Sequence, residues 1–165
     1  MKFSEMPYER PDLEGLKQTL AGLTQRLKAA KSYDEARAVF LEKEEAERHI
    51  DTLATLASVR NSIDTRDEFY DGEMSFWNAA MPELEEYGQD WKLAMLESPY
   101  RKDFEGEYGN LMFLNTEIAL KTFSPEIVPQ LQQENDLTLA YSKLLASARI
   151  PFEGKTYTLA QMGPF

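Results

Sequence analysis

The single histidine of the chain, His49, limits the metal chemistry that the sequence can support. A His-Glu-x-x-His helix needs two histidines one turn apart, and catalytic zinc takes most of its protein ligands from histidine. A di-iron bundle needs Glu-x-x-His motifs, whereas Glu45 and His49 stand four residues apart. We therefore expect His49 to be a partly exposed or capped helix residue. The sequence yields no catalytic, cofactor-binding or metal-binding residue.

Motifs for other kinds of catalysis are also missing. The sequence has no cysteine, no Gly-x-Ser-x-Gly elbow, and neither of the common glycine-rich phosphate loops. These absences leave no thiolate and no phosphate cradle, and they disfavour serine-nucleophile chemistry. One helical segment is rich in carboxylates with basic neighbours, a pattern typical of a solvated face with internal ion pairs. Its members are Glu42, Lys43, Glu44, Glu45, Glu47 and Arg48.

Composition narrows the function classes further. The 165 residues include 29 acidic and 18 basic side chains, which give a net charge of -11. Nucleic-acid binding depends on clustered lysine and arginine, so we predict no nucleic-acid partner. The sequence has no apolar stretch near the ~20 residues that span a bilayer, and its N-terminus does not have the pattern of a signal peptide. We expect a folded, cytoplasmic protein with no membrane partner.

Helical periodicity begins near the N-terminus. A first helix is expected after an N-cap at Asp12, with leucines spaced three and four residues apart. A second helix opens with a capping box of Ser32 and Glu35 and runs to about Asn61. These two segments predict an antiparallel helix pair.

The third expected helix carries much of the aromatic mass. Asp64, Thr65 or Asp67 could cap it, and it is expected to reach towards Glu97, with Pro82 placed to kink or break it. Aromatic residues at helical spacing are typical either of a core or of a surface that docks onto another domain. Both readings stay open.

Two serine-proline pairs predict later helix starts. Ser98-Pro99 opens a short helix that ends at Gly109, and residues 111–122 form a more apolar helix, expected to be buried on most sides. Ser124-Pro125 predicts the start of a last helix. Because Pro129 falls within its first turns, this helix either starts later than the cap indicates or begins with a kink. Its apolar stripe consists of Leu131, Leu137, Tyr141, Leu144, Leu145 and Ala148.

The pattern alternates after Arg149. Apolar residues flank Glu153-Gly154-Lys155, which predicts a small hairpin. Thr158 and Gln161 then have capping-box spacing, with only four residues behind them, which indicates either a truncated helix or a frayed terminus. The predicted fold class is mainly α, an antiparallel multi-helix bundle with a small C-terminal β-hairpin.

Three stretches of sequence, residues 3–12, 54–70 and 120–127, resemble the opening portion of oligoendopeptidase F-type enzymes. These enzymes are thimet-oligopeptidase-like zinc metallopeptidases. The similarity continues through residues 146–148 and 152–157. The similarity covers essentially the whole of this sequence, but only the N-terminal part of the longer sequences of the family.

The resemblance implies a helical N-terminal domain, residues 1–148, that packs around a C-terminal catalytic domain and helps to enclose a cleft for short peptides. Residues 149–165 are then the hairpin and the start of a truncated connection to the absent catalytic domain. The family's zinc ligands lie beyond this sequence, so none carries over to a residue here, and the chain alone is expected to be inactive. The alternative is a free-standing helical module that binds peptides or proteins without catalysis.

Overall fold

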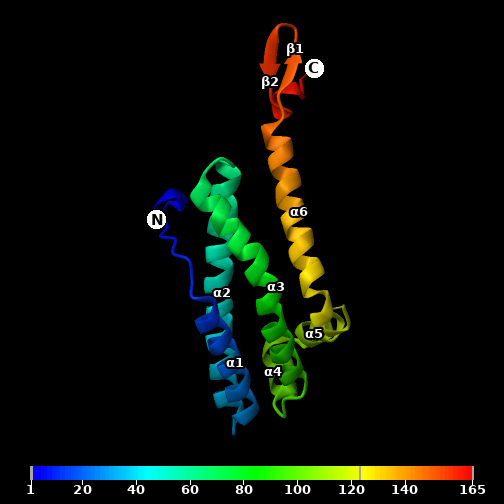
Figure 1. Ribbon diagram of the computed structural model, residues 1–165. Helices are drawn as coiled ribbons and strands as arrows, with labels where there is room; N and C mark the ends of the chain where they lie inside the picture. Colours follow the sequence, from blue (N-terminus) through cyan, green and yellow to red (C-terminus); the bar gives the residue numbers. More distant parts are fainter. Residues whose placement is uncertain (1, 123, 165) are drawn as a thin grey trace.

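The computed structural model describes residues 2–122 and 124–164. Its chain runs through six α-helices and a two-stranded hairpin, with three short 3-10 turns (Figure 1). In chain order the elements are η1 (Phe3–Glu5), α1 (Leu13–Ala29), α2 (Tyr33–Ile63), α3 (Glu68–Leu96), α4 (Arg101–Tyr108), α5 (Asn110–Thr122), η2 (Pro125–Ile127), α6 (Val128–Ser147), β1 (Ile150–Phe152), β2 (Lys155–Tyr157) and η3 (Ala160–Met162). The predicted fold class is confirmed.

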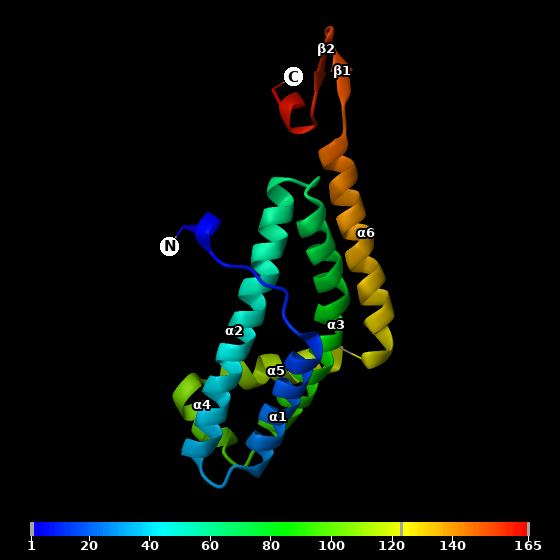
Figure 2. The same ribbon diagram turned by 60° about the vertical axis from the view of Figure 1, so that its left-hand side comes forward.

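Helices α1, α2 and α3 form an antiparallel bundle, in which α1 spans only part of the length of its two neighbours (Figures 1 and 2). The predicted caps Ser32 and Asp67 hold the N-terminal ends of α2 and α3, whereas Asp12 precedes α1 without a side-chain cap hydrogen bond. The Ser32 hydroxyl oxygen accepts from the Glu35 amide at 3.2 Å, and Asp67 accepts from the amides of Phe69 and Tyr70. Helix α2 extends to Ile63, two residues past the predicted end.

Two apolar clusters fill the bundle. One lies between α1 and the middle of α2 and α3, and contains Leu20, Ile50, Leu53, Ala57, Trp77, Ala80 and Leu84. The other joins the far end of the bundle to α4 and α5, and contains Leu23, Leu27, Ala36, Val39, Phe40, Trp91, Ala94, Met95, Phe104 and Phe113. Both tryptophans therefore belong to the core, whereas Phe69 at the start of α3 is 56% exposed.

Helix α4 starts later than predicted. It begins at Arg101 instead of Pro99, because the Ser98 hydroxyl accepts from the Tyr100 amide at 3.2 Å and so closes a turn before the helix. Gly109 ends α4, as predicted, with a φ of +87° that glycine adopts without strain. Glu107 near its C-terminus accepts hydrogen bonds from Arg37 and Tyr33 of α2, which lower the pKa of Glu107 to about 2.

The expectation that residues 111–122 are buried on most sides is wrong. Among the described side chains of α5, Phe113 alone is buried, while Leu111, Leu114 and Ile118 are more than half exposed. None of the helices in the described part of the chain covers these three side chains.

Helix α3 passes through Pro82 without breaking. Proline has no backbone N–H, so the carbonyl of Asn78, four residues earlier, cannot receive its usual helical hydrogen bond. The Asn135 side chain of α6 donates to this carbonyl at 3.3 Å, and Gln132 donates to the adjacent Ala79 carbonyl at 2.9 Å. Helix α6 therefore docks where Pro82 interrupts the backbone hydrogen bonding of α3.

Helix α6 starts at Val128, so the reading in which Pro129 delays the helix is confirmed. The 3-10 turn η2 precedes it, and Ser124 makes no side-chain cap. The helix rises beside α3 and carries the hairpin beyond the end of the bundle (Figure 2). Among its described residues Val128 alone is buried, because α6 packs on one neighbour and leaves its apolar stripe outside.

The hairpin has the predicted position and turn. Strands β1 and β2 pair antiparallel with Pro151 opposite Thr156, and positive φ angles of 49° at Glu153 and 77° at Gly154 fit a two-residue type I′ turn. Thr158 and Gln161 form both bonds of the predicted capping box, at 2.9 and 3.3 Å, and the turn η3 follows. The division into 1–148 and 149–165 stays a prediction.

The contact between Gln132 and α3 yields a test of how α6 is held. Gln132→Ala removes the hydrogen bond to Ala79 and should weaken the docking of α6 by about 1 kcal/mol. Amide hydrogen exchange in α6 should then be about fivefold faster. The neighbouring Gln133 is exposed and forms no hydrogen bond in the described chain, so Gln133→Ala is the matched control. Equal exchange rates in the two variants would contradict this docking geometry.

Candidate functional site

The N-terminal segment is tied to α3 by a buried carboxylate. Glu73 is 3% exposed, and it accepts from the Tyr8 hydroxyl at 2.5 Å and from the Arg10 guanidinium at 2.7 Å. The Trp77 indole N–H donates in turn to the Tyr8 oxygen at 3.0 Å. These bonds join residues more than sixty positions apart in sequence, and so fix the segment before α1 across the bundle.

The charges in this network follow from its hydrogen bonds. Burial raises the pKa of Tyr8 to about 12, and the hydrogen bond to Glu73 acts in the same direction. Burial alone would raise the pKa of Glu73, but the hydrogen bonds from Arg10 and Tyr8 outweigh it and leave this pKa below its ordinary value of 4.5. Glu73 is therefore ionised and Tyr8 is neutral at pH 7.

Arg60 of α2 holds the preceding residues in place. Its guanidinium donates to the carbonyl oxygens of Met6 at 2.6 Å and Phe3 at 3.3 Å, and to the Tyr70 hydroxyl at 2.7 Å. Phe3 and Met6 thus become one end of a groove along α2 and α3.

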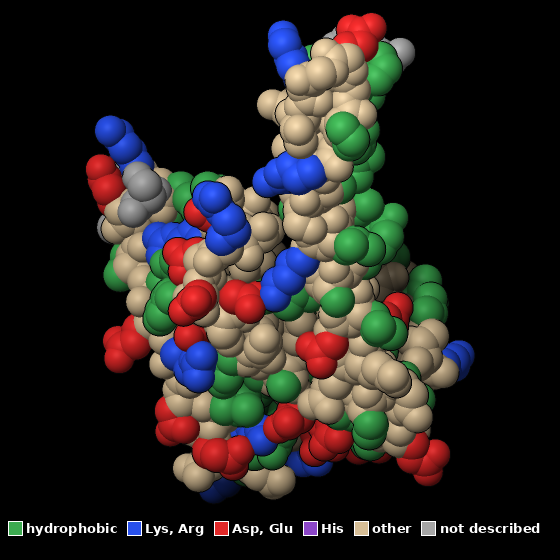
Figure 3. All heavy atoms as spheres, turned by 45° about the horizontal axis from the view of Figure 1, so that its top comes forward, with side chains coloured by type: hydrophobic (Ala, Val, Ile, Leu, Met, Phe, Trp, Pro, Cys, Tyr) green, Lys and Arg blue, Asp and Glu red, His purple; other side chains and the backbone are tan. Residues whose placement is uncertain are grey.

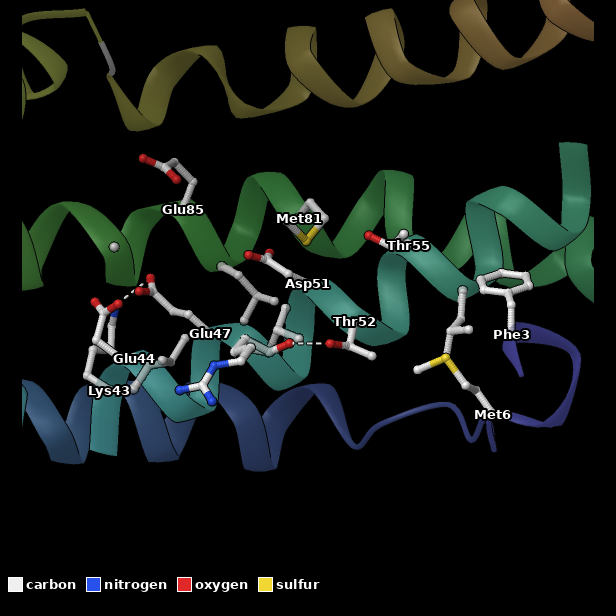
Figure 4. A pocket seen from close by; sticks show the side chains of 16 residues that line it. Phe3, Met6, Lys43, Glu44, Glu47, Asp51, Thr52, Thr55, Met81 and Glu85 are labelled. Carbon is white, nitrogen blue, oxygen red and sulfur yellow. Dashed lines mark hydrogen bonds and ion pairs between the residues drawn. The ribbon is translucent and has the colours of Figure 1, made fainter. Parts of the chain in front are cut away.

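This groove has a volume of about 750 Å³. Carboxylates face it from both helices: Glu44, Glu47 and Asp51 of α2, and Glu85 of α3 (Figure 4). Glu85 is paired with Lys92 at 2.6 Å. Glu44 and Asp51 form no ion pair with any described residue, so the groove offers uncompensated negative charge beside apolar side chains such as Met81 and Leu84.

Lys43 occupies a place that sequence reasoning missed. We predicted a solvated pairing partner, but its side chain is 2% exposed, is paired with Glu47, and has its Nζ 5.2 Å from the ring centroid of Trp91. The predicted ion pair is present, but the Lys43 side chain is buried and not solvated as predicted. Its spacing from Val39 and Ile50 was the available signal, because it places position 43 on the apolar stripe of α2. The buried Glu73 gave no comparable signal, since its partners are distant in sequence.

Among the described residues, the groove brings together no complete set of groups for metal-dependent hydrolysis. Within residues 2–122 and 124–164, no three histidine, cysteine, aspartate or glutamate side chains lie close enough together to hold a metal ion. His49 is exposed on α2, and it is not among the residues that line the groove. The carboxylates are spread along two helices instead of converging on one point (Figure 4).

Helices α5 and α6 carry a second feature that suits binding. Figure 3 shows hydrophobic side chains along the projecting part of the molecule formed by α6 and the hairpin. We call these exposed residues the outer stripe: Leu111, Leu114 and Ile118 of α5, and Leu137, Tyr141, Leu144 and Leu145 of α6. Large apolar side chains that stay exposed along a helix are candidates for a contact surface. Of the helices in the described parts of the chain, none is both long and apolar enough to cross a membrane.

A family model described as the peptidase M3 N-terminal domain matches residues 3–123. The chain belongs to this family. The match covers η1 to the end of α5, and therefore includes both the groove and the Glu73 network. No curated protein matches the chain.

Solved structures extend the likeness of this M3 N-terminal domain to the whole chain. PZ peptidase A with inhibitor 2 is 41% identical over 99% of the chain, with a TM-score of 0.95. A protein provisionally named oligoendopeptidase F is 39% identical over 100%, with a TM-score of 0.96, and a similarly named Bacillus anthracis strain Ames protein is 37% identical over 100%, with a TM-score of 0.95. The chain spans about 30% of each of these proteins. It is the N-terminal region of an oligoendopeptidase F-like peptidase, as the sequence resemblance predicted.

The lowered pKa of Glu73 predicts how stability of the M3 N-terminal domain depends on pH. A lowered pKa stabilises the fold above the ordinary value near 4.5, and this contribution is lost as pH falls through the lowered value. Glu73→Gln should therefore lower the free energy of unfolding at pH 7 by about 2 kcal/mol and flatten its decline in acid. Urea unfolding across pH measures both effects.

Glu86→Gln is the matched control, because Glu86 is exposed on the same helix and has no ion pair within the described residues. Equal urea midpoints for the two variants at pH 7 would show that the Glu73 network does not hold the N-terminal segment.

Proposed function

We propose that this chain is the non-catalytic N-terminal portion of a zinc-dependent oligoendopeptidase that hydrolyses short peptides. In this proposal the chain packs against a C-terminal catalytic domain of the same polypeptide and contributes to the walls of the substrate cleft. The helical domain comprises residues 1–148, residues 149–165 lead towards the catalytic domain, and the enzyme is cytoplasmic.

The observation that carries the proposal is the outer stripe. Leu144 is 67% exposed and Leu111 is 62% exposed, although both lie on well-formed helices. Burying a leucine or isoleucine side chain is worth about 1.5–3 kcal/mol, so the five leucines and one isoleucine of the stripe left in water represent a large unused stabilisation. The relatives hold the same 165-residue fold at TM-scores of 0.95–0.96 within chains more than three times as long. The additional polypeptide is the proposed cover for the stripe.

The residues of this chain do not fit a zinc ion, since its one histidine is exposed and the acidic side chains of the groove are spread along two helices. In a zinc peptidase the metal activates water and polarises the scissile carbonyl. No step of that chemistry is assigned to a residue here. The contribution of this chain is to bind and confine the peptide.

The groove is the proposed cleft wall. Its uncompensated Glu44 and Asp51 would attract basic side chains of a peptide. Its apolar residues would contact apolar side chains next to them in the same peptide. The same groove is the observation that favours the alternative function, a free-standing module that binds peptides without cleaving them.

Zinc content and peptidase activity separate the two functions. The purified 165-residue chain should contain no stoichiometric zinc and should cleave no quenched fluorescent peptide, because its described residues form no metal site and place no general base beside one. The polypeptide encoded by the native gene should contain zinc and cleave such peptides. Metal analysis and fluorescence increase provide the readouts.

Sequencing the native gene supplies the control. An in-frame His-Glu-x-x-His codon series downstream of Phe165 supports the proposal. Zinc or peptidase activity in the isolated chain would contradict it. So would a native gene that stops after Phe165, and a defined peptide complex of that chain would then support the free-standing module.

A further inference from the structure

The acidic groove continues into a second hollow at the end opposite the N-terminal segment. Lys43, Glu44, Glu47 and Gly88 line both hollows, and beyond them lies a space of about 160 Å³ between α2, α3 and α5. We call this space the Trp91 pocket. Its apolar lining residues are Phe40, Trp91, Met95, Met112 and Phe113. A peptide that follows the groove past its carboxylates therefore reaches an apolar pocket.

The Trp91 pocket can be reached by a side chain that lies in the groove. Gly88, Met112 and Thr116 of its lining are partly exposed, and Phe40 and Trp91 keep 7% and 6% of their surface exposed. Water in the pocket meets mainly apolar side chains, so its displacement by an apolar group is favourable. An apolar cavity of about 150 Å³ can hold a benzene ring. The volume thus suits the side chain of phenylalanine or leucine.

Gly88 lies within helix α3 where the groove meets the Trp91 pocket. Glycine inside a helix lowers the equilibrium constant of folding about fivefold relative to alanine. The described chain does not need this glycine for packing, because the atom nearest to an added Cβ is a Glu85 carboxylate oxygen at 3.6 Å, an ordinary contact. What the glycine does provide is a passage from the groove to the pocket that no side chain fills.

Charge determines which residue suits the place beside the pocket. Lys43 is paired with Glu47, and Lys92 is paired with Glu85. Among the described residues, Glu44 is the lining carboxylate of the Trp91 pocket that forms no ion pair. Glu44 also lines the groove, so the junction of the two hollows attracts a cation.

We infer that the groove and the Trp91 pocket together bind a peptide in which phenylalanine or leucine stands next to lysine or arginine. The apolar side chain enters the Trp91 pocket past Gly88, and the basic side chain pairs with Glu44. This inference rests on the proposed function, since it names the class of peptide that the proposed cleft wall receives. The occupant is a free peptide.

Fluorine NMR with fluorotryptophan-labelled protein measures this binding in the 165-residue chain and in the polypeptide encoded by the native gene. The probe is acetyl-Ala-Phe-Lys-Ala-amide, and EDTA is present so that no metal-dependent cleavage occurs. Trp91 should show a saturable shift, whereas Trp77, which belongs to the other apolar cluster, is the internal control. Alanine in place of the phenylalanine of the probe should raise the dissociation constant at least tenfold, and glutamate in place of its lysine should raise it several-fold. Equal binding of the three peptides, or no binding, overturns the inference.

Two glycine variants of α3 separate binding from folding. Gly88→Leu and Gly72→Leu both place a good helix former where an added Cβ has room, so both should raise the urea midpoint. Gly88→Leu fills the passage and should raise the dissociation constant of the probe at least tenfold. Gly72 lines neither hollow, so Gly72→Leu should leave binding unchanged. Equal binding by the two variants overturns the inference.

A charge variant decides the matter if Gly88→Leu does not fold. Glu44→Gln should raise the dissociation constant of the lysine probe several-fold. Glu86→Gln on exposed α3 surface, which lines neither hollow, should not change it. Unchanged binding by Glu44→Gln overturns the inference.

The outcomes also separate this inference from the proposed function. A native polypeptide that contains zinc and cleaves peptides, but whose Trp91 signal does not respond to the probe, supports the proposed function and overturns the inference. A native protein without zinc that binds the probe at Trp91 contradicts the proposed function and supports the inference. A response in the isolated chain alone would mean that other main chain fills the pocket in the native polypeptide, and it would overturn the assignment to a free peptide.

Discussion

Polar contacts with α3 hold α6 in position: two of them reach backbone carbonyls beside Pro82, and Asp136 and Lys143 of α6 contact Asn78 and Asp71. Proline leaves the Asn78 carbonyl without its usual helical donor, and the amides of Asn135 and Gln132 bind this carbonyl and that of Ala79. A buried apolar seam would normally join two helices, but α6 buries only Val128 among its described residues. Its attachment is polar and specific, and this attachment sets the direction of the hairpin that follows.

This polar attachment has two consequences. The exposed apolar residues of α6 belong to the outer stripe, whereas Leu139 of the same helix lines the cavity beside α3. The space between the helices is also not closed by apolar packing, so the cavity beside Asn61 remains. In the proposed function, the outer stripe is the surface that contacts the catalytic domain.

Charged side chains of α2 and α3 hold the N-terminal segment of the chain in place. Glu73 and Arg60 draw the N-terminal segment across α2 and α3, so that Phe3 and Met6 close one end of the acidic groove. The fold presents surfaces, and the chemistry of hydrolysis is proposed to reside elsewhere in the polypeptide.

Local signals predicted most of the fold. Ser32, Asp67 and Gly109 marked helix ends, and Glu153-Gly154 marked the hairpin turn, because each acts through backbone groups a few residues away. The burial of residues 111–122 was mispredicted, since an apolar pattern shows that a face needs a partner but not where the partner lies.

The functional surfaces were harder to predict. Lys43 could have been placed on the apolar stripe by its spacing, but the contacts of Glu73 and the walls of the Trp91 pocket depend on residues brought together only by folding. The sequence showed that the common catalytic motifs are absent. It did not show the groove or the cavity, which form only when distant segments fold together.

Thiol labelling of the outer stripe tests the central claim most directly, because the chain has no cysteine of its own. Leu144→Cys reports on the stripe, and Lys28→Cys, exposed at the far end of α1, is the control. In the isolated chain both thiols should react rapidly. In the polypeptide encoded by the native gene, labelling at position 144 should slow at least tenfold while position 28 is unchanged. Equal rapid labelling at position 144 in both proteins would contradict the account.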